Sequence, residues 1–179
     1  MLIAAVFFLS AGCGKVPTPP PSPSQPLEEE KEGLKEPSPP RMQEITLFFV
    51  SEDTNSLTPE VREIEPGGRD LKLVALEELI QGPKNPALGR TIPPEAKVLW
   101  ITVEENALAV VNFSKEIVTA HWGGSMGEIM TVYSVVNTLA LFPDIEQVKF
   151  LVEGEEVETL TGHLDMSGPL EPDWGLVEE

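Results

Sequence analysis

Cys13 is the residue best suited to covalent chemistry, because it is the only cysteine of the chain and a thiol is a nucleophile that can be acylated. The eight apolar residues 2–9 (LIAAVFFL) precede it, followed by the small residues 10–12 (SAG). Such a run is too short to span a bilayer, which takes about 20 residues, but it fits the apolar core of an export signal. A single thiol outside the cell is a liability unless it is modified. We therefore expect residues 1–12 to be a signal peptide and Cys13 to be modified.

The two histidines, His121 and His163, are the next candidates for chemistry. His163 and Asp165 are two residues apart, so an extended segment would place both side chains on one face. A metal site needs three or more ligands, and the lone cysteine is reserved for acylation, so we interpret the two as a surface or packing pair. Ser114 lacks the Gly-x-Ser-x-Gly setting of a hydrolase nucleophile. We expect no catalytic residue, no metal and no cofactor, and predict that the chain is not an enzyme.

Other polar and aromatic residues have a structural interpretation beside a functional one. Asn112 and Ser114 are expected to hydrogen-bond the turn that follows a strand, and Asn137 and Thr138 to bond nearby backbone within an apolar helix. Trp122 lies in a glycine loop, where it could contact a partner or a sugar, but we favour partial burial against the following helix. An envelope hydrolase would need an acid/base pair of carboxylates, which the many glutamates could supply. We disfavour this alternative.

The charge of the chain excludes some classes of partner. Twelve basic residues face 30 acidic ones, which gives a formal net charge of -18. Such a surface repels the phosphates of nucleic acids and the headgroups of anionic lipids. The charge either keeps an exported protein soluble, which we favour, or matches a basic partner at a site that the sequence does not locate.

Composition divides the chain into a tether and a folded part. Half of the 18 prolines lie between residues 17 and 40, next to a cluster of glutamates. Proline removes backbone donors and the glutamates repel one another, so this stretch cannot bury enough apolar area to fold. We predict a semi-stiff linker over residues 13–43, a domain over residues 44–165 and an acidic tail over residues 166–179.

The predicted domain alternates strand and helix patterns. Strands are expected at residues 44–51, 57–64, 97–104, 107–114 and 147–152, and helices at residues 71–81 and 128–142. A last strand is expected to run toward Val157 after a turn at residues 154–155. Asp70 fits the N-cap of the first helix, which Gly82 would end in a left-handed cap, and Ser125 with Glu128 matches a capping box. The second helix has an apolar stripe made of Ile129, Val132, Tyr133, Val136, Leu139 and Ala140. The order predicts an α+β fold with two layers, in which two helices pack on one face of a small mixed sheet.

Two resemblances follow from these segments. Residues 10–13 (SAGC) after the apolar run resemble the lipobox of bacterial lipoproteins, in which Cys13 would become the lipidated first residue. The domain resembles the GerMN domain of sporulation and spore-germination lipoproteins. The matching segments are LFFVSED, LVALEELIQGP, IPPEAKVLWITVEENALAVVNFS, VVNTL and QVKFLVEGE, followed by the tail ETLTGHLDMSGPLEPD.

The GerMN resemblance implies a single, non-catalytic protein-interaction domain whose fold is similar to that of ring-building modules. It further implies a role in assembling an envelope complex in sporulation or germination, with partners of unknown identity. The protein would be extracytoplasmic and held to the cell membrane by the lipid at Cys13. We expect no nucleic acid among its partners. Ring-building relatives suggest self-association, whereas a charge of -18 opposes it, so the sequence leaves the oligomeric state open. A surface lipoprotein that binds cell wall or solute is the alternative.

Overall fold

The computed structural model describes residues 41–51 and 56–178 of the chain. The predicted signal peptide, the lipidation site Cys13 and nearly all of the predicted linker lie outside the described residues. Within the described ranges, no helix is long and apolar enough to cross a membrane.

The first sheet is built on a hairpin of two long strands. β1 (Gln43–Ser51) pairs with β2 (Leu57–Ile64) in antiparallel register, and the short β3 (Leu88–Gly89) pairs with the end of β1 on its other side. The two long strands confirm the prediction, whereas β3 is too short and too close to prolines to be predicted. Ile45, Leu47 and Phe49 alternate along β1 and are all buried in the main core.

The first helix, α1 (Leu71–Gln81), begins and ends where local chemistry predicts. The Asp70 side chain accepts a hydrogen bond of 2.8 Å from the amide of Lys72, as an N-cap residue does. Gly82 ends the helix with φ 89° and ψ 175°, which is a positive-φ conformation but not the left-handed cap that we expected. The positive φ favours glycine at this position, where a Cβ would also lie 2.8 Å from the guanidinium carbon at the end of the Arg90 side chain.

The second sheet has four strands in the order β4-β5-β6-β7. β4 (Val98–Val103) and β5 (Leu108–Phe113) form the predicted hairpin, and β6 (Gln147–Val152) runs parallel to β5. The turn between them is residues 104–107, where only residues 105–106 were expected, and Ala107 adopts φ 60° within it. β7 (Glu155–Glu156) pairs with the end of β6. The short helix α2 (Glu116–Thr119) and the long helix α3 (Ser125–Leu139) connect β5 to β6, as a parallel pair requires.

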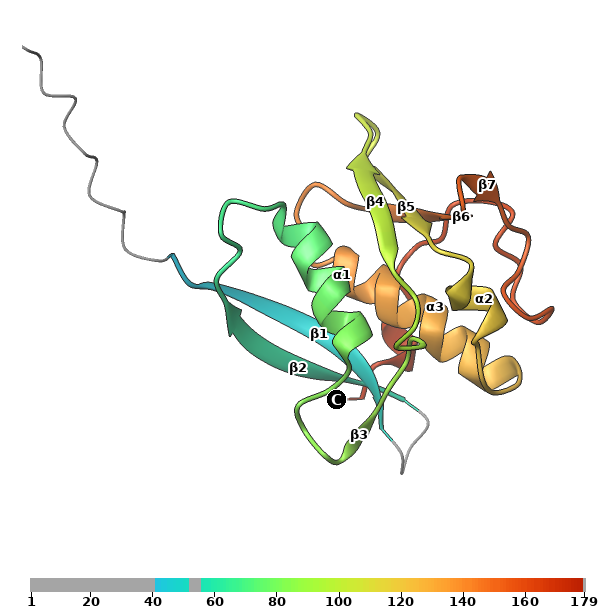
Figure 1. Cartoon of the computed structure of the whole chain (residues 1–179), viewed down its shortest axis with the longest axis horizontal. Helices are drawn as coiled ribbons and strands as arrows, with labels where there is room; N and C mark the ends of the chain where they lie inside the picture. The colour runs from blue at the N-terminus through green and yellow to red at the C-terminus, as the bar shows by residue number, and fades with distance from the viewer. Residues whose placement is uncertain (1–40, 52–55, 179) are drawn as a thin grey trace, which may run out of the picture. The chain divides into compact units, whose positions relative to one another are not determined.

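Both long helices contact strands of both sheets (Figure 1). α1 packs on β1 and β4, and α3 packs on β1 and β6. The predicted α+β class is confirmed, but the strands are divided between two sheets where one was expected. Of its predicted stripe, α3 buries Val132, Val136 and Leu139, whereas Ile129, Tyr133 and Ala140 stay partly exposed. Other faces of α3 are buried too. Its buried residues are Glu128, Met130, Thr131, Val132, Ser134, Val135, Val136, Asn137, Thr138 and Leu139.

The C-terminal segment packs on the domain. Leu170 exchanges two backbone hydrogen bonds with Val148 of β6, at 2.9 and 2.8 Å. The 3-10 turn η1 (Trp174–Leu176) follows, and Val177 forms a parallel bridge to Leu57 of β2. Together with Leu176, Val177 covers a small second core that contains Phe48, Leu57 and Met130.

Candidate interaction surface

The structure separates His163 from Asp165. The Nδ1 atom of His163 lies 3.1 Å from the carboxylate of Glu128, whereas Asp165 accepts hydrogen bonds from the amide and hydroxyl of Ser167 at 3.0 and 2.7 Å. Over residues 41–51 and 56–178, no three side chains of His, Cys, Asp or Glu are grouped as metal ligands would be. The two residues therefore act in separate local contacts.

Glu128 does not have the capping role that its spacing from Ser125 predicts. The capping-box prediction is wrong: α3 begins at Ser125 with Gly124 as its N-cap, and no side chain caps it. The carboxylate of Glu128 is fully buried and points to the segment 159–163 instead. It accepts hydrogen bonds from the amides of Leu160, Thr161 and His163, at 2.8, 3.0 and 2.9 Å, and from the hydroxyls of Thr159 and Thr161.

These donors decide the ionisation of Glu128. Burial alone would raise its pKa, but the hydrogen bonds from Thr159, Thr161 and Leu160 outweigh burial and lower the pKa to about 2. Glu128 is therefore a carboxylate at neutral pH and holds the segment 159–163 against the start of α3. A group so firmly ionised and enclosed is unsuited to exchange protons with a substrate near neutral pH.

His121 and Trp122 lie just before α3. The Nε2 atom of His121 is 3.0 Å from the hydroxyl of Thr131, and that hydroxyl can donate to the carbonyl of Thr91 or of Gly127. Burial lowers the pKa of His121, although the charge of Glu128 opposes this. Trp122 stacks on His121 with 6.3 Å between ring centres and stays 46% exposed. His121 thus has a packing role, and Trp122 is only partly covered.

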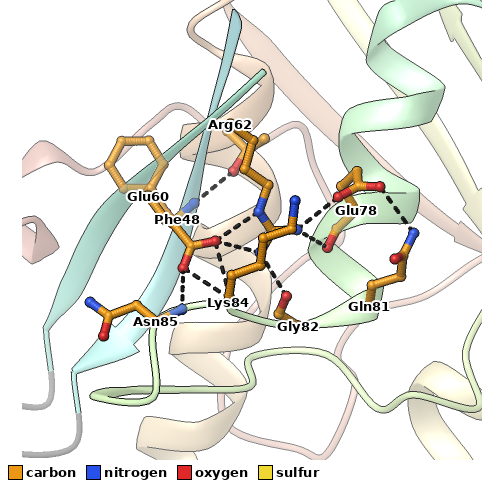
Figure 2. Close-up of polar contacts among 9 residues, drawn as sticks. Phe48, Glu60, Arg62, Glu78, Gln81, Gly82, Lys84 and Asn85 are labelled. Carbon is orange, nitrogen blue, oxygen red and sulfur yellow. Dashed lines mark hydrogen bonds and ion pairs between the residues drawn. The ribbon is translucent and has the colours of Figure 1, made fainter. Parts of the chain in front are cut away.

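Arg62 forms a buried ionic cluster that joins β2 to the end of α1, as Figure 2 shows. Its guanidinium donates to the carboxylate of Glu60 at 2.7 Å, to that of Glu78 at 2.9 Å and to the carbonyl of Gly82 at 2.7 Å. Glu60 in turn accepts from the amides of Lys84 and Asn85. Burial raises the pKa of Glu60, but the bonds from Asn85, Arg62 and Lys84 prevail and lower it. The cluster is saturated with internal partners, as a structural site is.

The buried hydroxyl and amide side chains also act as cross-links, over longer distances than predicted. Asn137 exchanges two hydrogen bonds with the backbone of Asp173, 36 residues away, at 2.9 and 3.0 Å. Thr138 accepts from the amide of Phe48 in β1 at 3.2 Å. Asn112 accepts from Gly154 at 2.8 Å and Ser114 from Lys97 at 3.0 Å. The predicted preference for backbone partners holds, but most of the partners are remote in sequence.

An exposed apolar area lies on β4, away from these clusters. Residues 98, 101 and 103 of β4 face the helices, and Trp100 and Thr102 face away from them, as the register with β5 requires. Trp100 is 40% exposed, and Leu99, at an irregularity in the strand, is 45% exposed. We call Leu99, Trp100 and the unpaired side of β4 the β4 edge. Unlike the buried polar groups, it has apolar surface to offer a partner.

Comparison with known proteins assigns the domain. A family model named Germane and described as "Sporulation and spore germination" matches residues 46–158, which is more than half of the chain. The chain belongs to the Germane family. The predicted GerMN domain is thereby confirmed. No curated protein matches the sequence.

Solved structures share the Germane fold. The tandem GerMN domains of the sporulation protein GerM from Bacillus subtilis match 79% of the chain with a TM-score of 0.62 and 18% identity. The chain spans half the length of that tandem structure. The first GerMN domain of the same protein matches 72% of the chain, over 97% of its own length, with a TM-score of 0.62 and 21% identity. A protein from Clostridium perfringens described as a lipoprotein matches 73% of the chain and 87% of its own length, with a TM-score of 0.52 and 26% identity.

Proposed function

We propose that this Germane protein is a non-catalytic lipoprotein that supports assembly of an envelope complex in sporulation or spore germination. The lipid at Cys13 anchors it outside the membrane, and residues 14–43 carry the domain away from the bilayer. The observation that carries the proposal is the match of residues 46–158 to a family of sporulation and spore germination. The similarity to a protein described as a lipoprotein supports the anchor.

The polar groups of the domain agree with a role in interaction. Glu128, Glu60 and Arg62 are each held by several internal donors or acceptors, so their charges stabilise the fold. An acid/base pair needs two groups that can reach a substrate and exchange protons with it. The exposed apolar area on β4 is, by contrast, of the kind that mediates contacts between proteins.

A sugar-binding role has less support. A hollow of about 470 Å³ is lined by Glu158, Thr159, Gly162, His163, Leu164, Asp165 and Ser167, and no Phe, Tyr or Trp is among them. The exposed tryptophans Trp100, Trp122 and Trp174 lie on separate elements. Sugar sites place an aromatic face beside converging polar groups. Retention of the protein on purified peptidoglycan above that of an unrelated acidic protein would favour the cell-wall alternative.

Metabolic labelling tests the anchor. Cells that express the full-length chain are grown with a clickable fatty-acid analogue, and the protein is compared with the Cys13→Ala variant. We expect label and membrane association in the wild type and the loss of both in the variant, because the thiol is the acylated atom. A Ser24→Ala variant, in the linker outside the lipobox, is the matched control and should remain labelled. Equal labelling of wild type and Cys13→Ala would contradict the anchor.

Deletion of the gene in its host tests the pathway. The account predicts a defect in engulfment, spore yield or germination, because assembly of the envelope complex would lack one component. Wild-type behaviour in all three assays would remove the sporulation role.

A further inference from the structure

We propose that the β4 edge binds an extended, basic segment of a partner protein, which adds to the second sheet as a fifth strand. The inference rests on the proposed function and specifies the surface and the chemistry of its partner. Three features of the second sheet support it, namely the free backbone groups of β4, its exposed side chains and the charge around the sheet.

The backbone of β4 has free hydrogen-bonding groups on one side. β4 is the terminal strand of its sheet, with β5 as its partner. In an antiparallel pair, hydrogen-bonded residue pairs alternate with non-bonded ones. The amide of Glu104 donates to the carbonyl of Leu108 at 2.9 Å. The pairs Thr102–Val110 and Trp100–Asn112 are therefore the next bonded pairs along β4. The amides and carbonyls of Ile101 and Val103 therefore point away from β5. An incoming strand can pair with these groups.

The β4 edge lacks the charged side chains, the proline and the short length that protect the other sheet edges from added strands. Charged side chains, proline and very short strands are the usual protection. Among the described strands, β2 contains Pro59 and is bridged by Val177, β3 has two residues, and β7 consists of Glu155 and Glu156. β4 has six uncharged residues, VLWITV, and exposes Leu99 and Trp100. A bulge can also protect an edge, but the irregularity of β4 lies at its start, between Val98 and Trp100, and the strand pairs regularly with β5 from Trp100 to Val103.

Charge selects the partner. The sheet and its two hairpin turns, residues 97–113 and 146–158, contain seven glutamates and two lysines. One of these lysines, Lys149, is already paired with Glu156. A second copy of this chain would bring two acidic surfaces together, whereas lysines or arginines that alternate with apolar residues would meet opposite charge. The occupant is therefore a basic extended segment of another protein.

Peptide binding to the full-length chain tests this surface. The probe is a nine-residue peptide of alternating valine and lysine, and alternating valine and glutamate is its counterpart. We expect the basic peptide to bind, to change the fluorescence of Trp100 and to slow hydrogen exchange at Ile101 and Val103. The Leu99→Lys/Trp100→Lys variant should bind about tenfold more weakly, because it replaces two apolar contacts by like charge. Both side chains are exposed, so the fold should be retained.

The Trp122→Lys/Met126→Lys variant is the matched control, since it adds the same charge at two exposed residues elsewhere. It should bind the basic peptide nearly as well as the wild type. Equal weakening in both double variants, equal binding of the acidic peptide or unchanged exchange at Ile101 and Val103 would overturn the proposal.

The two proposals can fail separately. Normal sporulation of a deletion strain would remove the proposed function and leave peptide binding intact. A defective deletion strain that the Leu99→Lys/Trp100→Lys chain restores fully would remove the surface and leave the function.

Discussion

Replacing Glu128 by glutamine is expected to lower the free energy of unfolding by about 3 kcal/mol. The carboxylate is fully buried and accepts bonds from three amides and two hydroxyls. A glutamine keeps the volume but presents an amino group to donors, so that at least one buried amide loses its acceptor. The fall in pKa of Glu128 from 4.5 to about 2 corresponds to about 3 kcal/mol. Urea unfolding followed by tryptophan fluorescence measures the difference.

The same variant should show a characteristic pH dependence. Because the pKa of Glu128 is lowered in the folded state, its contribution is complete above the unfolded value of 4.5 and is lost as the pH falls to about 2. Burial and hydrogen bonding lower the pKa of Glu60 as well, so the informative quantity is the difference between wild type and variant. That difference should be constant near pH 7 and shrink between pH 4.5 and 2.

An exposed glutamate close to the same segment provides the control. Glu158→Gln should change the free energy of unfolding by no more than about 0.5 kcal/mol, because a solvated carboxylate loses little. A Glu128→Gln protein as stable as the Glu158→Gln protein at pH 7, or a difference that persists at pH 2, would contradict the role assigned to Glu128.

Replacing Arg62 by methionine is the second change with a large expected effect, a loss of about 3–5 kcal/mol. Arg62 is 4% exposed and lies 5.2 Å from the ring centre of Phe49. Methionine fills part of the space but leaves the carboxylates of Glu60 and Glu78 and the carbonyl of Gly82 without their cation. The free energy of unfolding of the Arg62→Lys variant should lie between those of the wild type and Arg62→Met, because lysine keeps the charge and loses the planar guanidinium.

The exposed pair of Arg69 and Glu77 is the matched comparison for the Arg62 cluster. About half of the Arg69 side chain is in solvent, so Arg69→Met should cost no more than about 1 kcal/mol. Chemical denaturation of the three variants gives the ranking directly. Equal losses for Arg62→Met and Arg69→Met would show that burial of the Arg62 cluster does not matter.

The parts of the fold that local chemistry determines were predictable. α1 has its N-cap at Asp70 and ends at Gly82, and the residue types at these two positions predict both ends. The alternation in β1 likewise indicates which side chains enter the core. Residues that act through remote partners were not predictable. Glu128 is three residues after Ser125, the spacing of a capping box, but its donors lie 31 to 35 residues further on and outcompete that local bond.

Arg62 and α3 illustrate the same limit. A charged residue in an alternating strand is normally placed in solvent, and only the return of the chain through α1 and Gly82 encloses Arg62. The apolar stripe of α3 predicts one buried face, whereas the C-terminal segment at Asp173 and strand β1 of the first sheet make Asn137 and Thr138 buried as well. The β4 edge is visible only once the strand order is known, since the sequence of β4 is that of any buried strand.

Spore yield in a complemented deletion strain tests the central claim most directly. The host gene is deleted and replaced at its own locus by the wild-type chain, the Cys13→Ala chain or the Leu99→Lys/Trp100→Lys chain, with protein levels matched by immunoblot. The account predicts that the wild-type chain restores heat-resistant spores and that the two variants do not, because one lacks the anchor and the other the contact surface. Full spore yield in the deletion strain itself would contradict the account.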